Sequence, residues 1–249
     1  MEERHGDRGH TEAGGLVSVL GGFDWRRAGV TLPTTAAGQR LIAFLAVRHR
    51  PIARGTVAGT LWPEASEARA SASLRTELWK LGKIGSPVHV LADGRLTLDP
   101  ATTCDLHEAT ELAHRLIDGE ASTPTGPVAR LLHHDLLPDW AEDWLEVERA
   151  RFHQLRLHAL DALCDRHARE QRYAAAVDTA LAAIDADPYR ESSRRCLVAA
   201  YLGEGNVRDA IDEVRTFERL LAEELEAEPT NALRSMIPAV TERTTLTVR

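Results

Sequence analysis

The apolar and polar positions of the first hundred residues predict a small sheet followed by three helices. Residues 16–32 alternate apolar and polar side chains between glycines, which is typical of short strands joined by turns. Apolar residues then recur every three or four positions, the spacing of one helix face. We expect these helices over residues 34–48, 54–62 and 67–81. Pro51 and Pro63 separate them, because proline cannot continue a helix.

Local signals complete this first domain. Thr34 or Thr35 can cap the first helix and Ser66 the third, because a hydroxyl oxygen can accept from free backbone N–H groups. Further on, two short apolar–polar runs meet at Asp93-Gly94, which is a strong hairpin signal. A sheet, three helices and a hairpin, in this order, predict a winged helix, whose third helix enters the DNA major groove.

The rest of the chain, from about Asp105, is predicted to be helical. Residues 119–129 are rich in Ser, Thr, Pro and Gly and form the one linker-like passage. A long helix is expected over residues 138–169.

A repeat follows the long helix. Residues 173–177 and 207–211 occupy equivalent places 34 residues apart, the period of tetratricopeptide repeats. The prolines expected to end the second helices, Pro188 and Pro229, are 41 residues apart, so the later helix should be seven residues longer. The expected fold class is therefore an α+β winged helix followed by an all-α, tetratricopeptide-like helical domain.

The net charge of −8 hides a strong asymmetry. Residues 14–100 hold 11 Lys and Arg against six acids, a net charge of +5. Residues 101–249 hold 17 Arg against 28 acids, a net charge of −11. This asymmetry suggests a first part that binds a polyanion such as DNA and a second part that avoids it.

The third helix carries the candidate reading face. Leu74, Leu78 and Leu81 share its apolar side, and small, hydroxyl and cationic residues occupy the other. Arginine can bridge O6 and N7 of guanine, and hydroxyls adapt to several bases, although the solvated face of an ordinary helix would look similar. Trp79 is expected to pack under the wing or the preceding loop, because duplex bases are not free for stacking. The candidate DNA-binding residues, on this helix and elsewhere, are Arg50, Arg54, Ser71, Ser73, Arg75, Thr76, Lys80, Lys83 and Arg95.

Arginines outside the third helix are candidate phosphate contacts. Arg48, Arg50 and Arg54 surround the start of the second helix, and Arg95 lies in the expected wing. Phosphate contacts give affinity without sequence information, and any of these arginines could instead be a surface charge.

No catalytic or metal-binding pattern emerges, so we expect no enzyme, cofactor or metal site. His158, Asp161 and Asp165 share a helix face but lack the spacing of a metal motif, and a solvated acidic face explains them better. The cysteines are expected to be reduced core thiols. They are Cys104, Cys164 and Cys196. The chain contains no apolar run long enough to cross a bilayer and no signal-peptide core at its start, which favours a cytoplasmic protein.

Two stretches resemble a known family. RPIARGTVAGTLWPEASEARASASLRTELWKLG, which begins at Arg50, resembles the helix-turn-helix of the OmpR-type winged helix as it occurs in the antibiotic regulatory protein (SARP) family. DLLPDWAEDWLEVERARFHQLRLHAL, from Asp135, and the DPYRES block, from Asp187, resemble the bacterial transcriptional activator domain that accompanies it. The chain is similar to a short form of this family.

The resemblance implies an activator that binds promoter direct repeats as a side-by-side pair and recruits RNA polymerase holoenzyme, often at a secondary-metabolite (antibiotic) gene cluster. Its partners would be double-stranded promoter DNA, the sigma factor and other polymerase subunits, and a second copy of the chain on DNA, with no membrane. By position, the polymerase-contact loop would be Trp62, Pro63, Glu64, Ala65 and Ser66.

The expected domains follow from these patterns. They are a disordered tail over 1–14, the DNA-binding domain over 15–102, the activator domain over 103–238 and a tail over 239–249. A repressor of the same architecture, or a helical-repeat adaptor that does not bind DNA, remain the alternatives; the cationic first part argues against the adaptor.

Overall fold

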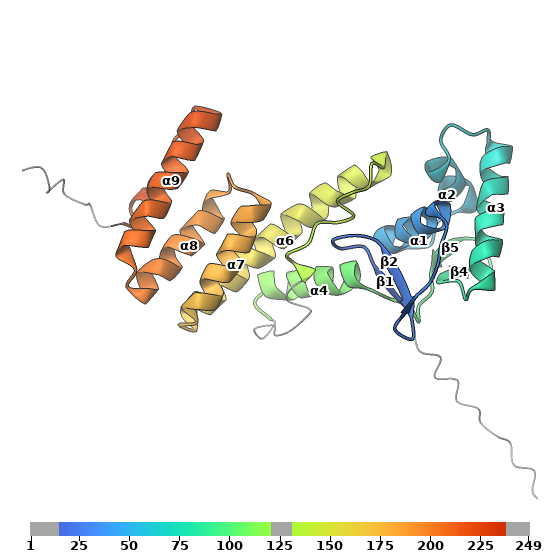
Figure 1. The fold of residues 1–249 in the computed structure, drawn as a ribbon, viewed down its shortest axis with the longest axis horizontal. Helices are drawn as coiled ribbons and strands as arrows, with labels where there is room; N and C mark the ends of the chain where they lie inside the picture. The colour runs from blue at the N-terminus through green and yellow to red at the C-terminus, as the bar shows by residue number, and fades with distance from the viewer. Residues whose placement is uncertain (1–14, 121–130, 238–249) are drawn as a thin grey trace, which may run out of the picture. The chain divides into compact units, whose positions relative to one another are not determined.

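The computed structural model describes residues 15–120 and 131–237 (Figure 1). The chain divides into two compact units. Among the described residues, the first consists of 15–108 together with Asp135–Glu148, and the second of 109–120, 131–134 and 149–237. The predicted tails and residues 121–129 of the predicted linker lie outside the described residues.

The strands expected over residues 16–32 are confirmed and belong to a four-stranded sheet. The sheet consists of β1 Gly15–Ser18, β2 Asp24–Arg27, β3 Val30–Thr31 and β6 Thr103–Cys104. Its order is β3-β2-β1-β6, with β1 antiparallel to β2 and parallel to β6. Val17 and Trp25 pair across β1 and β2 and are both buried, which fixes the register on the core face.

The three helices and the hairpin are also confirmed, so the first unit is a winged helix (Figure 1). These elements are α1 Ala36–Arg48, α2 Arg54–Leu61, α3 Glu67–Lys83, β4 Val88–Val90 and β5 Leu96–Leu98. Helix α1 is central, because it contacts α2, α3, β1 and β5. Its residues Leu41 and Leu45 are completely buried.

One of the two predicted helix caps forms as expected. The Thr35 hydroxyl oxygen accepts a hydrogen bond from the Gly38 N–H at 3.0 Å and caps α1. Ser66 occupies the N-cap position of α3, but its side chain makes no capping hydrogen bond. The start of α3 is therefore set by backbone geometry rather than by the hydroxyl.

Asp105, the residue after β6, carries a buried carboxylate that binds the backbone just after β1. Asp105 accepts hydrogen bonds from the backbone N–H groups of Val19, Leu20 and Leu106 at 2.7–3.1 Å. Burial raises the pKa of this carboxyl, and the three N–H donors oppose that rise.

The chain returns to the first unit after Asp135. The Gly21 N–H donates to the Asp135 carbonyl, and the Leu137 N–H donates to the Val19 carbonyl, each at 2.8 Å. Leu136 and Leu137 are buried. This segment is therefore part of the core of the winged-helix unit.

The long helix starts later than predicted. Helix α6 spans Asp143–Arg169 rather than residues 138–169. Residues 138–142 are not helical, and Leu137 before them has a positive φ of 44°. The Glu142 carboxylate accepts from Arg40 and from the Trp144 indole N–H, each at 2.8 Å. Glu142, just before the helix, thus makes tertiary contacts and is not part of a first helical turn.

The second unit is an α-helical stack (Figure 1). Besides most of α6 and α4 Asp105–Ile117, it contains α7 Tyr173–Ala186, α8 Glu191–Glu204, α9 Val207–Leu225 and α10 Asn231–Arg234. Two apolar clusters hold α6, α7 and α8 together and then α8, α9 and α10. The three cysteines are free and buried, as expected.

The equivalent positions Tyr173 and Val207 are the first residues of α7 and α9, which agrees with the predicted 34-residue repeat. Helix α9 has 19 residues and α7 has 14, so the predicted difference of seven residues is wrong by two. Glu226 adopts a left-handed conformation with φ 51°, and this ends α9 before Pro229.

Candidate nucleic-acid interface

Helix α3 separates its side chains into a buried and an exposed face. Ala70, Leu74 and Leu81 are buried, and Leu78 is partly buried. The exposed positions from 69 to 83 carry four cations and no acid. These cations are Arg69, Arg75, Lys80 and Lys83. A face with this composition fits the surface of a polyanion.

The middle of this face holds the predicted reading residues. Arg75 is exposed, and no polar contact of its guanidinium is found among the described residues. Thr76 is also exposed, and its hydroxyl donates to the Ala72 carbonyl at 3.0 Å. Ser71 and Ser73 lie closer to the core and are partly buried. Arg75 is thus the side chain of this group with the most freedom to reach a ligand.

A buried carboxylate that the sequence reading missed ties α3 to α1. Glu77 is buried and accepts from the Thr35 hydroxyl at 2.5 Å and the Lys80 ammonium at 2.7 Å. Burial alone would raise the pKa of Glu77, but the hydrogen bonds from Lys80 and Thr35 outweigh burial and lower it. Thr35 therefore both caps α1 and fixes the position of α3. The Lys80 ammonium is therefore ion-paired with Glu77.

The hairpin is attached to the start of α2. Ile52 and Leu96 exchange both backbone hydrogen bonds at 2.8 Å, and Arg54 donates to the Gly94 carbonyl at 3.1 Å. Arg95 forms an exposed ion pair with Asp93 at 2.7 Å. These contacts place Arg54 and Arg95 together at the turn of the wing.

Two other arginines expected near DNA differ in their surroundings. Arg48 forms an ion pair with Glu148 at 2.6 Å, and its side chain is 29% exposed. It therefore supports the first unit instead of extending into solvent. Arg50, two residues further on, is exposed.

Trp79 lies where the prediction did not place it. It is 62% exposed and does not pack under the wing or the preceding loop. Its helix position opposes the buried leucines, and the Lys83 ammonium lies 3.4 Å from its ring centroid. A cation–π contact within one helix turn replaces the expected burial.

The loop between α2 and α3 forms a tight turn. The Ala65 N–H donates to the Trp62 carbonyl at 3.1 Å. Trp62 and Ala65 are partly buried, whereas Pro63, Glu64 and Ser66 are exposed. Glu64 thus projects an acidic side chain next to the cationic helix.

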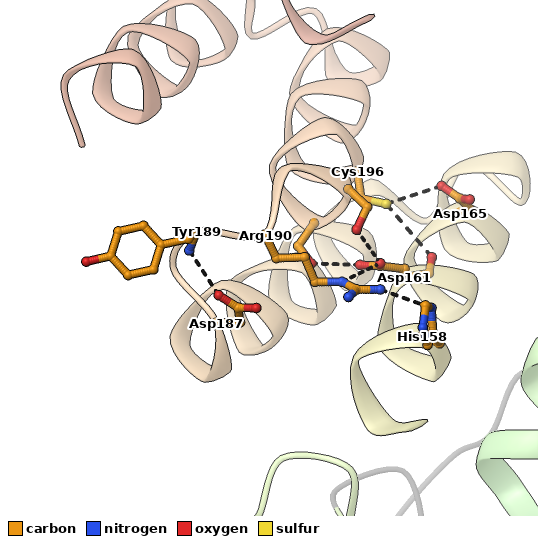
Figure 2. Close-up of polar contacts among 9 residues, drawn as sticks. His158, Asp161, Asp165, Asp187, Tyr189, Arg190 and Cys196 are labelled. Atoms are coloured by element: carbon orange, nitrogen blue, oxygen red, sulfur yellow. Dashed lines mark hydrogen bonds and ion pairs between the residues drawn. The ribbon is translucent and has the colours of Figure 1, made fainter. Parts of the chain in front are cut away.

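The solvated acidic face expected for His158, Asp161 and Asp165 is wrong for Asp161, whose side chain is only 15% exposed and belongs to a polar cluster of the second unit (Figure 2). Asp161 of α6 accepts from Arg190 at 3.0 Å and from the Ser192 and Ser193 hydroxyls at 2.7 Å. Arg190 also lies 3.0 Å from His158 Nδ1. The cluster holds the start of α8 against α6, and its carboxylate is already occupied by these donors.

The described ranges contain no candidate metal site and no candidate membrane span. Across residues 15–120 and 131–237, no group of three or more His, Cys, Asp or Glu side chains could hold a metal ion. Nor does any helix in this part of the chain combine the length and apolar character needed to span a membrane. Burial raises the pKa of the Cys104 thiol to about 12, so it stays protonated at neutral pH.

Comparison with known proteins identifies the second half of the chain. Residues 99–241 match the family described as bacterial transcriptional activator domain. The chain belongs to this family, within the SARP regulators. This SARP chain is 30% identical over 240 residues to the regulatory protein AfsR of Streptomyces coelicolor, and 28% identical over 223 residues to that of Streptomyces griseus.

The SARP chain spans about a quarter of the length of these relatives. The alignments cover 90% and 85% of this chain but 24% and 23% of the two AfsR proteins. Both relatives are named as regulatory proteins. A solved structure of Mycobacterium tuberculosis EmbR in complex with a low affinity phosphopeptide has the same fold, with a TM-score of 0.68 and 22% identity. That match covers 89% of this chain and 63% of EmbR.

Proposed function

We propose that this regulator is a sequence-specific transcription activator whose winged helix binds promoter DNA. The observation that carries the proposal is the exposed face of α3, on which four cations and no acid occupy positions 69–83. Membership of a transcription-activator family supports it. Residues 15–102 would bind DNA, and residues 103–238, with most of the chain's acids, would contact proteins.

The exposed side chains divide by role. Arg75 and Thr76, with Ser71 and Ser73 beside them, would read base edges in the major groove. The remaining cations would contact phosphates and fix the orientation of the protein on DNA. These phosphate-binding residues are Arg50, Arg54, Lys80, Lys83 and Arg95.

The proposal is tested by selecting bound sequences from a random duplex pool with the full chain. We expect enrichment of one motif, present as a direct repeat if two copies bind side by side. Mapping of bound fragments across the source genome would then give the promoters and show whether they belong to secondary-metabolite clusters. A chain that enriches no motif would be an adaptor rather than a DNA-binding regulator.

Lys83→Ala and Arg95→Ala are each expected to weaken binding to specific and scrambled duplexes equally. Each phosphate contact releases about one counterion, so each change should make the slope of log affinity against log salt shallower by roughly one. Fluorescence anisotropy across a salt series measures this slope. Arg208→Ala, an exposed arginine of α9, is the control and should leave it unchanged. If neither Lys83→Ala nor Arg95→Ala changes the slope, these two residues do not contact phosphate.

Glu64→Arg is expected to separate DNA binding from activation. Glu64 is exposed at the turn before α3 and beside the cationic face, where it would meet polymerase. We expect operator affinity within about twofold of the original chain and at least a severalfold loss of activated transcription in vitro. Glu67→Arg, at the first residue of α3, is the matched charge control. Equal losses of affinity and activation by Glu64→Arg would contradict the separation and assign the loop to DNA.

A further inference from the structure

Trp79 is the largest exposed apolar side chain on α3, and the proposed function does not yet use it. Tryptophan is highly buried on average in soluble proteins, so a ring that is 62% exposed is a candidate for contact with a ligand. In the part of the chain that the structure describes, no hydrogen bond of its indole N–H is found. Its ring lies on the same face as Arg75, Thr76 and Lys83.

The surroundings of Trp79 favour DNA over a protein partner. The Lys83 ammonium covers one face of the ring at 3.4 Å, which leaves the ring edge for a ligand. The neighbouring exposed positions carry cations and no acid. Duplex DNA presents one negative charge about every 1.7 Å along its axis, so phosphates can pair with these cations while the groove floor meets the ring.

We propose that Trp79 is a specificity-determining residue that contacts the C5-methyl group of a thymine in the major groove. This inference rests on the proposed DNA binding. The methyl is the apolar group among the major-groove edges of the bases, so an indole edge can recognise it without unstacking the duplex. Trp79 follows Arg75 by four residues, about 6 Å along the helix, which corresponds to roughly two base pairs. The thymine should therefore lie about two base pairs from the guanine that Arg75 reads.

The test removes single methyl groups from DNA. In the duplex selected by the original chain, each thymidine is replaced in turn by deoxyuridine, which keeps base pairing and lacks only the methyl. We expect one or two positions at which the original chain loses about fourfold in affinity, the effect of one buried methyl group. Trp79→Ala should bind the thymidine and deoxyuridine duplexes equally well, whereas Trp79→Phe should keep part of the discrimination.

Controls separate this inference from the proposed function. Tyr189→Ala removes an exposed aromatic residue from the second unit and should retain the full methyl effect. A methyl effect that persists in Trp79→Ala, or is missing at every position in the original chain, would overturn the inference while DNA binding stands. Trp79→Ala that binds and selects DNA normally but loses activation would assign the ring to a protein partner and also overturn it. If the original chain selects no motif, the proposed function fails and the inference with it.

Discussion

Replacing Arg75 by alanine is expected to lower the preference for the selected duplex over a scrambled one by roughly 5- to 150-fold, the range for loss of one bidentate contact with guanine. Arg75 is exposed at the middle of the α3 face, and none of the described residues engages its guanidinium. Its donors are therefore available to O6 and N7. Anisotropy titrations of the original and variant chains on both duplexes measure the ratio of affinities.

Two outcomes of the Arg75 experiment have different meanings. Arg75→Lys should recover affinity but little of the preference, because lysine lacks the planar fork of arginine. Arg215→Ala, an exposed arginine of α9, should change neither affinity. If Arg75→Ala lowers both affinities and leaves their ratio intact, Arg75 contacts phosphate and the reading face must lie elsewhere on α3.

Asp161→Ala is expected to destabilise the second unit locally by about 3 kcal/mol, because it leaves Arg190 and two serine hydroxyls without their shared acceptor. The Asp161 side chain is only 15% exposed, so water replaces it poorly. Amide hydrogen exchange of peptides from α8 should accelerate by roughly 100-fold. Peptides from α1 and α3 should be unaffected.

A matched variant defines what the Asp161 result means. Asp165→Ala removes an exposed carboxylate one turn further along α6, which accepts a hydrogen bond from the Cys196 thiol at 3.4 Å. It should change α8 exchange by no more than a few-fold. Similar acceleration in both variants would show that acidic charge on α6, rather than the Asp161 cluster, stabilises the start of α8.

The elements were predictable because the signals for them are short-range. Helix periodicity, a proline between helices and the Asp93-Gly94 turn each act within a few residues, and they gave the winged helix and the 34-residue offset. The start of α6 could not be read in this way. The residues before it make long-range contacts, such as that of Glu142 with Arg40, 102 residues away in sequence.

The candidate site was predictable in its outline but not in its internal contacts. The helical wheel placed Arg75 outside and Leu74 inside because both follow from position on one helix. Glu77 was missed, since helical periodicity does not show its contact with Thr35, 42 residues earlier. Trp79 was misplaced because its size suggested burial, whereas its position on the wheel, which places it outside, proved the better guide.

The return of Asp135–Glu148 to the first unit has a consequence for synthesis on the ribosome. A nascent chain that has reached Ile117 already contains every element of the winged helix, but Leu136 and Leu137 and the backbone donor for the Val19 carbonyl have not yet been made. Domains generally fold as units once their last residue has emerged. The winged-helix unit is therefore completed only after part of its neighbour has been synthesised, which delays its folding until residues 135–148 have emerged.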